Sequence, residues 1–155
     1  MNCENNTYSP KAKIVEVAAA LLWDTSDLSD TGESRRFLIC RRPPHKARGG
    51  LFEFVGGKRE EGESLPQTLQ RECMEEMGIS VEVGECFGET VYRYPDITVR
   101  LTLFHCRILA GTPQLLEHTE LRWILPAEIP LYEFCPADED FLRELQRKYG
   151  KRSVK

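Results

Sequence analysis

Apolar and polar residues alternate in blocks along the chain, and these blocks predict strands separated by one central helix. The strand-like runs are residues 14–23, 36–42, 80–93, 97–109 and 121–124. The first two are separated by the polar segment 24–34, so they predict a hairpin with a long connection. A shorter apolar piece, LFEFV at 51–55, leads directly into Gly56 and Gly57.

Two helices are predicted by their own start, stop and periodicity signals. Ser64 and Gln67 fit a capping box, Pro66 falls in the tolerant first turn, and Gly78 fits the C-terminal cap. A second, amphipathic helix is expected between residues 136 and 149. Its apolar positions at helical spacing are Phe141, Leu142 and Leu145. The pattern predicts an α/β protein, an α/β/α sandwich whose mixed sheet lies between helices.

The composition predicts one soluble domain over residues 1–155, with a loose N-terminus at 1–11. The chain is 41% apolar and 30% charged, which is ordinary for a globular protein of this length. The net charge of −4 argues against a nucleic-acid polymer as partner, because such surfaces are usually basic. No apolar run approaches the roughly 18 residues of a membrane span, and the first ten residues lack the order of a signal peptide. A membrane partner is therefore not expected.

The cysteines predict a reducing compartment. Six are present, at positions 3, 40, 73, 86, 106 and 135. They form no C-x-x-C pair, and most lie in apolar or strand-like runs, where a free thiol behaves as a small hydrophobe. Reduced core thiols in a cytoplasmic protein are favoured over a set of disulfides.

A cluster of three carboxylates lies within the first predicted helix. Glu72, Glu75 and Glu76 stand at i, i+3 and i+4, so they share one stripe of the helix surface. Like charges at i and i+4 cost a helix about 0.2–0.5 kcal/mol per pair. A hard divalent cation with oxygen ligands would offset that cost. For the cluster alone, an exposed acidic face is the favoured interpretation.

The spacing around this cluster favours the metal-binding interpretation. The chain matches G-x5-E-x7-R-E-U-x-E-E-x-G-U, with U apolar, from Gly57 to Ile79. Seven fixed positions would recur by chance in about one chain per million. This segment resembles the Nudix box, and the flanking residues of 14–145 resemble the MutT-like branch of the Nudix hydrolases. Val55 stands where that branch usually has proline, and Cys73 replaces the usual aliphatic residue.

The resemblance implies a Nudix fold and a magnesium site, with manganese as an open alternative. The implied metal ligands are the Gly56 carbonyl, Glu72, Glu75, Glu76 and Glu117. The implied general base is Glu72, with Glu117 as second choice. Arg71 would hold the geometry of the box by pairing with Glu63; its alternative role is a surface pair with Glu75 at i+4.

Four residues outside the metal set are implied to contact the substrate. Arg42 matches the family's phosphate-proximal arginine, and Lys58 resembles a phosphate-contacting lysine, with a solvated lysine as the alternative. Phe54 matches an aromatic of the base pocket, with core packing as the alternative. Asp138 matches a position that contacts the edge of the base. Its alternative is a charge that interacts with the dipole of the last helix.

The implied reaction is hydrolysis of a (deoxy)nucleoside triphosphate to a monophosphate and pyrophosphate. An ionised Asp138 can only accept hydrogen bonds, which suits the amino group of a CTP-like pyrimidine such as 5-methyl-dCTP. A protonated Asp138 could also serve 8-oxo-dGTP, so both substrates stay open. Pro95, sixteen residues after Ile79, fits a loose marker for the alternative, an ADP-ribose pyrophosphatase. A non-catalytic nucleotide-binding module is disfavoured, because all four box glutamates are present. The three histidines, including His118, are assigned no catalytic role, and the sequence leaves the oligomeric state open.

Overall fold

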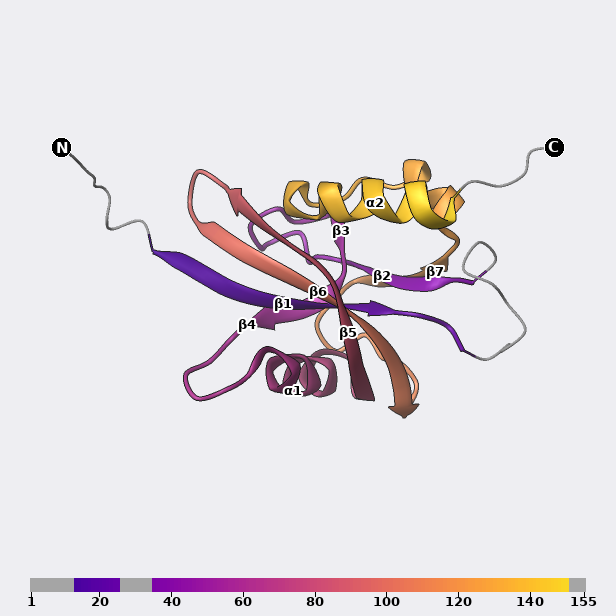
Figure 1. The fold of residues 1–155 in the computed structure, drawn as a ribbon, viewed down its shortest axis with the longest axis horizontal. Coiled ribbons are helices and arrows are strands. Elements are labelled where there is room, and N and C mark those ends of the chain that lie inside the picture. Colours follow the sequence, from indigo (N-terminus) through magenta and orange to yellow (C-terminus); the bar gives the residue numbers. More distant parts are fainter. Residues whose placement is uncertain (1–12, 26–34, 151–155) are drawn as a thin grey trace.

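The computed structural model describes residues 13–25 and 35–150, whose strands form two sheets (Figure 1). The four-stranded sheet has the order β4-β1-β6-β5. Its strands are β4 (Val55–Lys58), β1 (Ile14–Leu22), β6 (Thr98–Ala110) and β5 (Ser80–Arg93). β1 runs parallel to β6 and the other pairs are antiparallel, so this sheet is mixed. The second sheet, β3-β2-β7, is antiparallel and contains β3 (Phe52–Glu53), β2 (Phe37–Arg41) and β7 (Glu120–Ile124).

The two α-helices lie on opposite sides of the strands. They are α1 (Leu65–Met77) and α2 (Glu139–Tyr149), and two short 3-10 helices, η2 (Pro126–Leu131) and η3 (Pro136–Asp138), precede α2. In Figure 1, α1 lies below the strands and α2 above them. The expected α/β architecture with a mixed sheet between helices is confirmed. No helix in the described part of the chain is long and apolar enough to span a bilayer. The expectations for residues 1–11 and for most of the segment 24–34 lie outside the described residues.

The predicted hairpin between the first two strands is wrong. β1 and β2 belong to different sheets, and the backbone pairing near their ends is a bridge between Trp23 and Phe37 and a hydrogen bond from Asp24 N to Arg36 O. The physical reason is that both edges of β1 are already paired, one with β4 and the other with β6. No edge of β1 therefore remains for β2 beyond its last residues.

β1 is apolar from Val17 to Leu22 because both faces of this part of the strand are covered. Ala19, Leu21 and Trp23 belong to one core cluster, which also contains Phe141, Leu142 and Leu145 of α2. Ala18, Ala20 and Leu22 belong to a second cluster, which contains Leu69, Cys73 and Met77 of α1. Alternate residues of a strand point to opposite faces, so a strand buried on both faces must be apolar at every position.

The N-terminus of α1 is fixed by the predicted capping box. Ser64 Oγ accepts from Gln67 N at 3.2 Å, and Gln67 Oε1 accepts from Ser64 N at 2.8 Å. At the other end, Gly78 adopts φ 69°, a left-handed conformation that glycine reaches without strain. Both ends of the helix are therefore set by local residues, as the sequence predicts.

The loop before α1 is held to the helix by an ion pair. Arg71 Nε lies 2.5 Å from Glu63 Oε2, and Arg71 Nη2 lies 3.1 Å from Glu63 Oε1 and 3.0 Å from the Lys58 carbonyl. Glu63 Oε1 also accepts from Glu60 N and from Thr68 Oγ1. These hydrogen bonds, chiefly those from Arg71, lower the pKa of Glu63 from 4.5 to about 2. The alternative pair of Arg71 with Glu75 is present as well, at 3.3 Å.

Truncation of the buried face of α1 should destabilise the fold. Leu69 is fully buried against β1, so Leu69→Ala should lower the free energy of unfolding by about 2–5 kcal/mol through a lost contact and a residual cavity. Urea denaturation would measure the difference. The matched control is Met74→Ala on the same helix, where the side chain is 50% exposed and the change should stay within about 0.5 kcal/mol. Equal losses in the two variants would contradict the assignment of the packed face.

The pair of Glu63 and Arg71 should make stability depend on acid pH. A folded pKa of about 2 against an ordinary value of 4.5 means that the stabilisation is fully present above 4.5 and is lost as the pH falls through about 2. Glu63→Gln should therefore destabilise the protein at neutral pH, and its difference from the wild type should shrink between these two values. Chemical denaturation at several pH values would measure this. Glu61→Gln in the same loop, where the side chain is exposed, is the control. A difference that stays constant with pH would contradict the prediction.

Candidate active site

A cavity of about 350 Å³ brings together most of the residues that the sequence singles out. Its walls come from β1, β4, α1 and β6, from the loop after β2, and from the segments before β7 and α2. Eight predicted site residues line it: Arg42, Phe54, Gly56, Lys58, Glu72, Glu76, Glu117 and Asp138. Glu63, Arg71 and Glu75 lie outside its lining. The cavity therefore joins carboxylates from the helix to polar groups from three distant segments.

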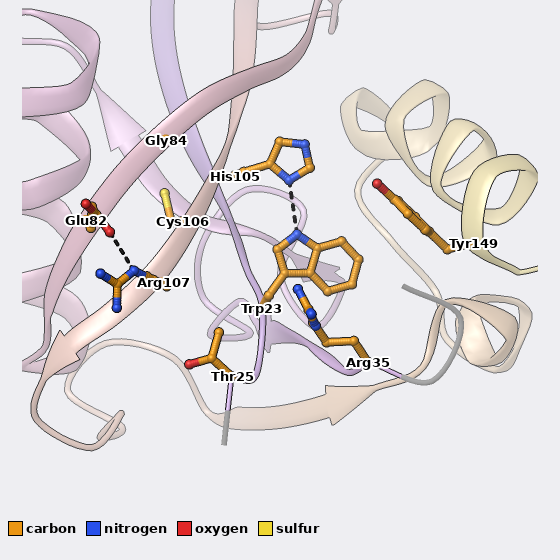
Figure 2. Close-up of a pocket in the computed structure, with 9 residues that line it drawn as sticks. All are labelled: Trp23, Thr25, Arg35, Glu82, Gly84, His105, Cys106, Arg107 and Tyr149. Atoms are coloured by element: carbon orange, nitrogen blue, oxygen red, sulfur yellow. Dashed lines mark hydrogen bonds and ion pairs between the residues drawn. The ribbon is translucent and has the colours of Figure 1, made fainter. Parts of the chain in front are cut away.

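A second cavity, of about 400 Å³, holds none of the predicted site residues (Figure 2). Trp23 Nε1 donates to His105 Nδ1 at 3.1 Å, and Tyr149 packs edge-on against the Trp23 ring. Its carboxylate, Glu82, is paired with Arg107 at 2.5 Å. An aromatic wall with one neutralised carboxylate offers no set of oxygen ligands, so we place the candidate active site in the first cavity.

Glu72 and Glu76 form the acidic end of the candidate site. The carboxyl group of Glu72 packs against the backbone of Gly57, where an added Cβ would lie only 2.3 Å from Glu72 Cδ. Glu76 Oε1 is buried and has no hydrogen-bond partner among the described residues. Burial, followed by the charge of Glu72 and a hydrogen bond with it, raises the pKa of Glu76. Two facing carboxylates with an unsatisfied buried oxygen, beside a glycine backbone, fit a divalent cation with oxygen ligands.

The other two predicted carboxylate ligands form different pairs in this structure. Glu75 has a side chain that is 59% exposed and pairs with Arg71. Glu117 lines the cavity, but its carboxylate is ion-paired with Lys46, and that hydrogen bond lowers the pKa of Glu117. The four glutamates therefore do not converge on one point, and each outer carboxylate is neutralised by the nearest cation.

A second set of polar groups lines another part of the cavity. Glu53 accepts from Arg42 Nη1 at 3.0 Å through Oε1, and its Oε2 lies 3.0 Å from His118 Nε2. Asp138 is only 4% exposed. Burial, and then the charge of Glu53, raises the pKa of Asp138 well above its usual range. Asp138 stands at the N-cap of α2, and its side chain makes no capping hydrogen bond there.

The positions of Phe54 and Lys58 are compatible with both interpretations of each residue: base pocket or core packing for Phe54, and phosphate contact or solvation for Lys58. Phe54 is 4% exposed and stacks on Phe37, with ring centroids 6.1 Å apart, yet it also lines the cavity. Core packing and lining of the cavity are therefore compatible at this position. Lys58 is exposed at the end of β4 and still borders the cavity.

Four residues of the cavity were given no role by the sequence analysis. Two of them, Glu53 and His118, form the pair described above. The sequence offered one signal for this pair, which is that Glu53 is a charged residue inside the apolar piece 51–55. Arg48 and Tyr94 stack, with the guanidinium 3.9 Å from the ring centroid. Tyr94 also accepts from Ala137 N at 2.9 Å, which anchors the segment that carries Asp138. No local pattern predicts that stack, because it joins two loops far apart in the sequence.

Known proteins with similar sequences and structures share this arrangement of elements. A model of the NUDIX domain matches residues 31–144. The CTP pyrophosphohydrolase of Escherichia coli is 35% identical over 126 residues, which cover 81% of this chain and 87% of that protein. The 8-oxo-dGTP diphosphatase of Escherichia coli is 30% identical over 115 residues, which cover 74% and 89%.

Solved structures agree with the sequence matches. The solution structure of the E. coli ORF135 protein has a TM-score of 0.73 at 31% identity, covering 94% of this chain and 97% of that one. The crystal structure of a MutT protein from Methanosarcina mazei Go1 has a TM-score of 0.76 at 24% identity, covering 93% and 100%, and it supports the fold. The resemblance seen in the box is confirmed over most of the chain: this protein belongs to the Nudix family, in its MutT-like branch.

Proposed function

We propose that the protein hydrolyses a nucleoside triphosphate to a monophosphate and pyrophosphate with the help of magnesium. The observation that carries this proposal is a single cavity with an unpaired carboxylate oxygen, that of Glu76, in one part and a buried acid with a raised pKa, Asp138, in a second. A metal-bound polyphosphate fits the first part and a base edge fits the second. The relatives named as CTP pyrophosphohydrolase and 8-oxo-dGTP diphosphatase support the same reaction class.

The metal would be held by oxygen ligands at the acidic end. Glu72, Glu76 and the Gly56 carbonyl border that end of the cavity. Glu117 and Glu75 would join them by leaving their pairs with Lys46 and Arg71. When bound, the cation neutralises charge on phosphate oxygens and acidifies a water molecule. Manganese accepts the same oxygen donors and stays an alternative.

The residues of the chain divide the remaining work. Arg71 holds Glu72 in place through a bond of 3.0 Å from Nη1 to Oε2, while its pair with Glu63 keeps the preceding loop in position. A carboxylate oxygen of Glu72 takes the proton of the attacking water. Glu117 is the weaker candidate for this role, because its lowered pKa reduces its basicity. Lys58 and Arg42 supply positive charge for the phosphates from two sides of the cavity.

Asp138 would recognise the edge of the base as a neutral acid. Burial raises its pKa and so favours the protonated carboxyl, which can both donate and accept a hydrogen bond. That combination serves 8-oxo-dGTP as well as a CTP-like pyrimidine, and the two remain the candidate substrates. No observation favours the ADP-ribose alternative, which is retained as a substrate to be tested.

The proposal also places the protein in the cytoplasm. Five cysteines in the described part of the chain are free, and four of them are buried. Free thiols are typical of a reducing compartment.

Product analysis with magnesium tests the reaction class. The substrates are the common NTPs and dNTPs, 5-methyl-dCTP, 8-oxo-dGTP and ADP-ribose. We expect a monophosphate and pyrophosphate from one triphosphate. Glu76→Gln should reduce turnover at least about tenfold. Replacing a residue that only supports a metal ligand already costs about tenfold, and loss of a ligand should cost at least as much. Glu61→Gln, the same change at an exposed position outside the cavity, should leave turnover unchanged.

Each other outcome of this assay contradicts a particular part of the proposal. Turnover of ADP-ribose alone would replace the triphosphate by a diphosphate derivative. Absence of turnover with every substrate would favour a nucleotide-binding module. Full activity of Glu76→Gln would remove the acidic end of the cavity from the mechanism.

Two substitutions at Asp138 test the recognition of the base. Asp138→Asn retains a donor and an acceptor in its amide group, so this variant should keep kcat/KM for the preferred triphosphate within about tenfold. Asp138→Leu has a similar volume without polar atoms, and it should lower kcat/KM by about 5–150-fold, the equivalent of about 1–3 kcal/mol for an unpaired polar group. Steady-state kinetics measure both, with melting temperatures as the control for folding. Wild-type kcat/KM in the leucine variant would exclude Asp138 from recognition.

A further inference from the structure

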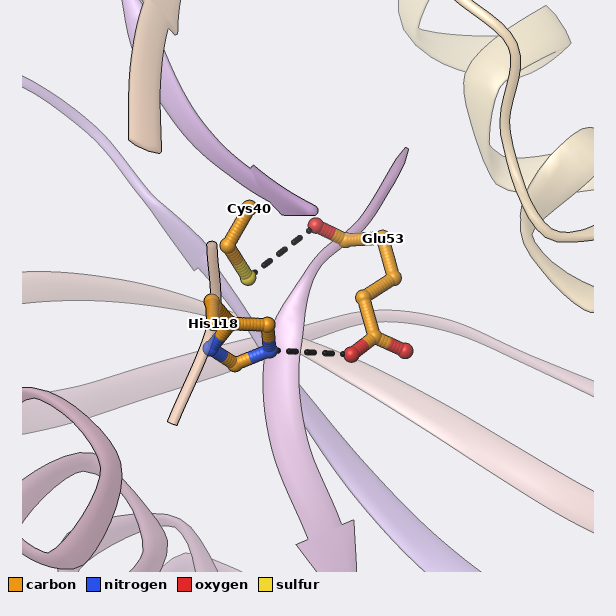
Figure 3. Close-up of side chains that lie close together, drawn as sticks. All are labelled: Cys40, Glu53 and His118. Atoms are coloured by element: carbon orange, nitrogen blue, oxygen red, sulfur yellow. Dashed lines mark hydrogen bonds and ion pairs between the residues drawn. The ribbon is translucent and has the colours of Figure 1, made fainter. Parts of the chain in front are cut away.

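Three potential metal ligands of different chemical types lie together in one wall of the cavity (Figure 3). They are Cys40 Sγ, a carboxylate oxygen of Glu53 and a ring nitrogen of His118, all within 4.8 Å of one another. Within the described residues, this is the group of histidine, cysteine and acidic side chains compact enough to hold an ion. The box glutamates do not belong to it.

The backbone of the smaller sheet fixes the relative positions of these three residues. Cys40 of β2 and Glu53 of β3 are directly paired across the antiparallel ladder. His118 lies beside them because Thr119 N donates to the Arg41 carbonyl at 3.0 Å. The cluster is therefore built on paired strands and not on a chance meeting of surface side chains.

We propose that Cys40, Glu53 and His118 form a second metal site, which binds a thiophilic divalent cation such as Zn²⁺. Thiolate, imidazole and carboxylate are the donors that Zn²⁺ takes in proteins, whereas Mg²⁺ prefers oxygen alone. A tetrahedral zinc ion places its donor atoms about 3.3–3.7 Å apart. The Glu53 and His118 donors already lie 3.0 Å apart, so side-chain adjustments of about 1 Å would complete the site.

The existing contacts support these three residues as ligands. Arg42 holds Glu53 Oε1 and so directs Oε2 toward His118. His118 has a side chain that is only 3% exposed, and its Nδ1 is buried without a hydrogen-bond partner in the described part of the chain. The ion would bind Nε2, the nitrogen that faces Glu53, and Nδ1 would then carry the ring proton. Cys40 donates to the Glu53 carbonyl at 3.4 Å, a weak bond that a metal can replace.

The local field favours a cation at this place. After burial, the charges of Glu53, Glu76 and Asp138 raise the pKa of the Cys40 thiol. The negative charge of Glu53 attracts a divalent ion, and the Arg42 guanidinium opposes it. When the ion binds, a metal–sulfur bond replaces the S–H bond and the proton leaves to solvent.

The remaining coordination position would face the cavity. Glu53 and His118 line the cavity, and Cys40 lies behind them. A water molecule or a substrate oxygen can therefore occupy that position. A bound ion would break the hydrogen bond between Glu53 and His118, next to Asp138, and so would disturb the part of the cavity that is proposed to bind the base. Metal binding at this site should therefore inhibit the hydrolysis proposed above.

Cobalt absorption tests the site independently of catalysis. Co²⁺ bound to thiolate gives a charge-transfer band in the near ultraviolet, and excess Mg²⁺ keeps the oxygen ligands occupied. Cys86 is exposed and Cys3 lies outside the described residues, so both are first replaced by serine. We expect the band in this background, its loss when Zn²⁺ is added, and its absence in Cys40→Ser. Cys106→Ser, a buried cysteine of β6, is the matched control and should retain the band.

A variant of His118 and the absorption spectrum of the parent protein provide two further tests of the site. His118→Asn should weaken Co²⁺ binding at least about tenfold. Binding that is unchanged in this variant would reduce the site to a lone thiol and overturn the proposal, as would an absent band in the parent protein. Circular dichroism melting shows whether each variant is folded.

Inhibition by Zn²⁺ then tests the consequence for catalysis. At fixed excess Mg²⁺, the parent should be inhibited, and Cys40→Ser should need at least about tenfold more Zn²⁺. Equal inhibition of the two would overturn the inhibitory role. This arm rests on the proposed function, whereas the absorption band does not, so failure of either can be distinguished.

Discussion

The pairing of β4 with β1 is the constraint on which the acidic end of the site depends. Gly56 pairs with Ala19 in this ladder, and an added Cβ at Gly56 would lie 2.1 Å from the Ala18 carbonyl oxygen. The close approach brings the backbone of Gly56 and Gly57 to the edge of the cavity. α1 packs on the same face of β1 through Leu69 and Cys73, so Glu72 reaches the backbone of Gly57. The small residues of β1 and β4 thus set the distance between the helix and the strand.

Charge compensation explains why this many carboxylates can share one cavity. At the rim of the cavity Arg71 hydrogen-bonds to Glu63, Glu72 and Glu75 at once, which the several donors of a guanidinium group allow, and its single charge offsets part of theirs. Lys46 pairs with Glu117 and Arg42 pairs with Glu53. Glu76 and Asp138 have raised pKa values, which indicates that the nearby cations do not compensate their burial. In the proposed mechanism, a divalent ion would offset the burial of Glu76, and Asp138 would act as a hydrogen-bonding group.

Local signals account for what could be predicted from the sequence. Capping residues set both ends of α1, and the spacing of the box glutamates identified the family and one end of the cavity. The prediction of a hairpin between β1 and β2 was wrong, because β1 pairs with β4 and β6, which lie far away in the sequence. The pair of Glu53 with His118 and the stack of Arg48 on Tyr94 were missed for the same reason. Contacts of this kind are fixed by the packing of two sheets, and no spacing along the chain encodes them.

The difference between two donor sets would allow one cavity to bind the two proposed metals in different places. Glu53 and His118 form a carboxylate–imidazole pair beside Asp138, and this pair alone offers only two ligands. Cys40 adds a third donor from a fully buried position, where a thiol packs as a small apolar side chain and costs the core little. A magnesium ion gains nothing from sulfur, whereas a zinc ion does. Selectivity between the ends of the cavity therefore follows from ligand softness, with Cys40 as the residue that creates the difference.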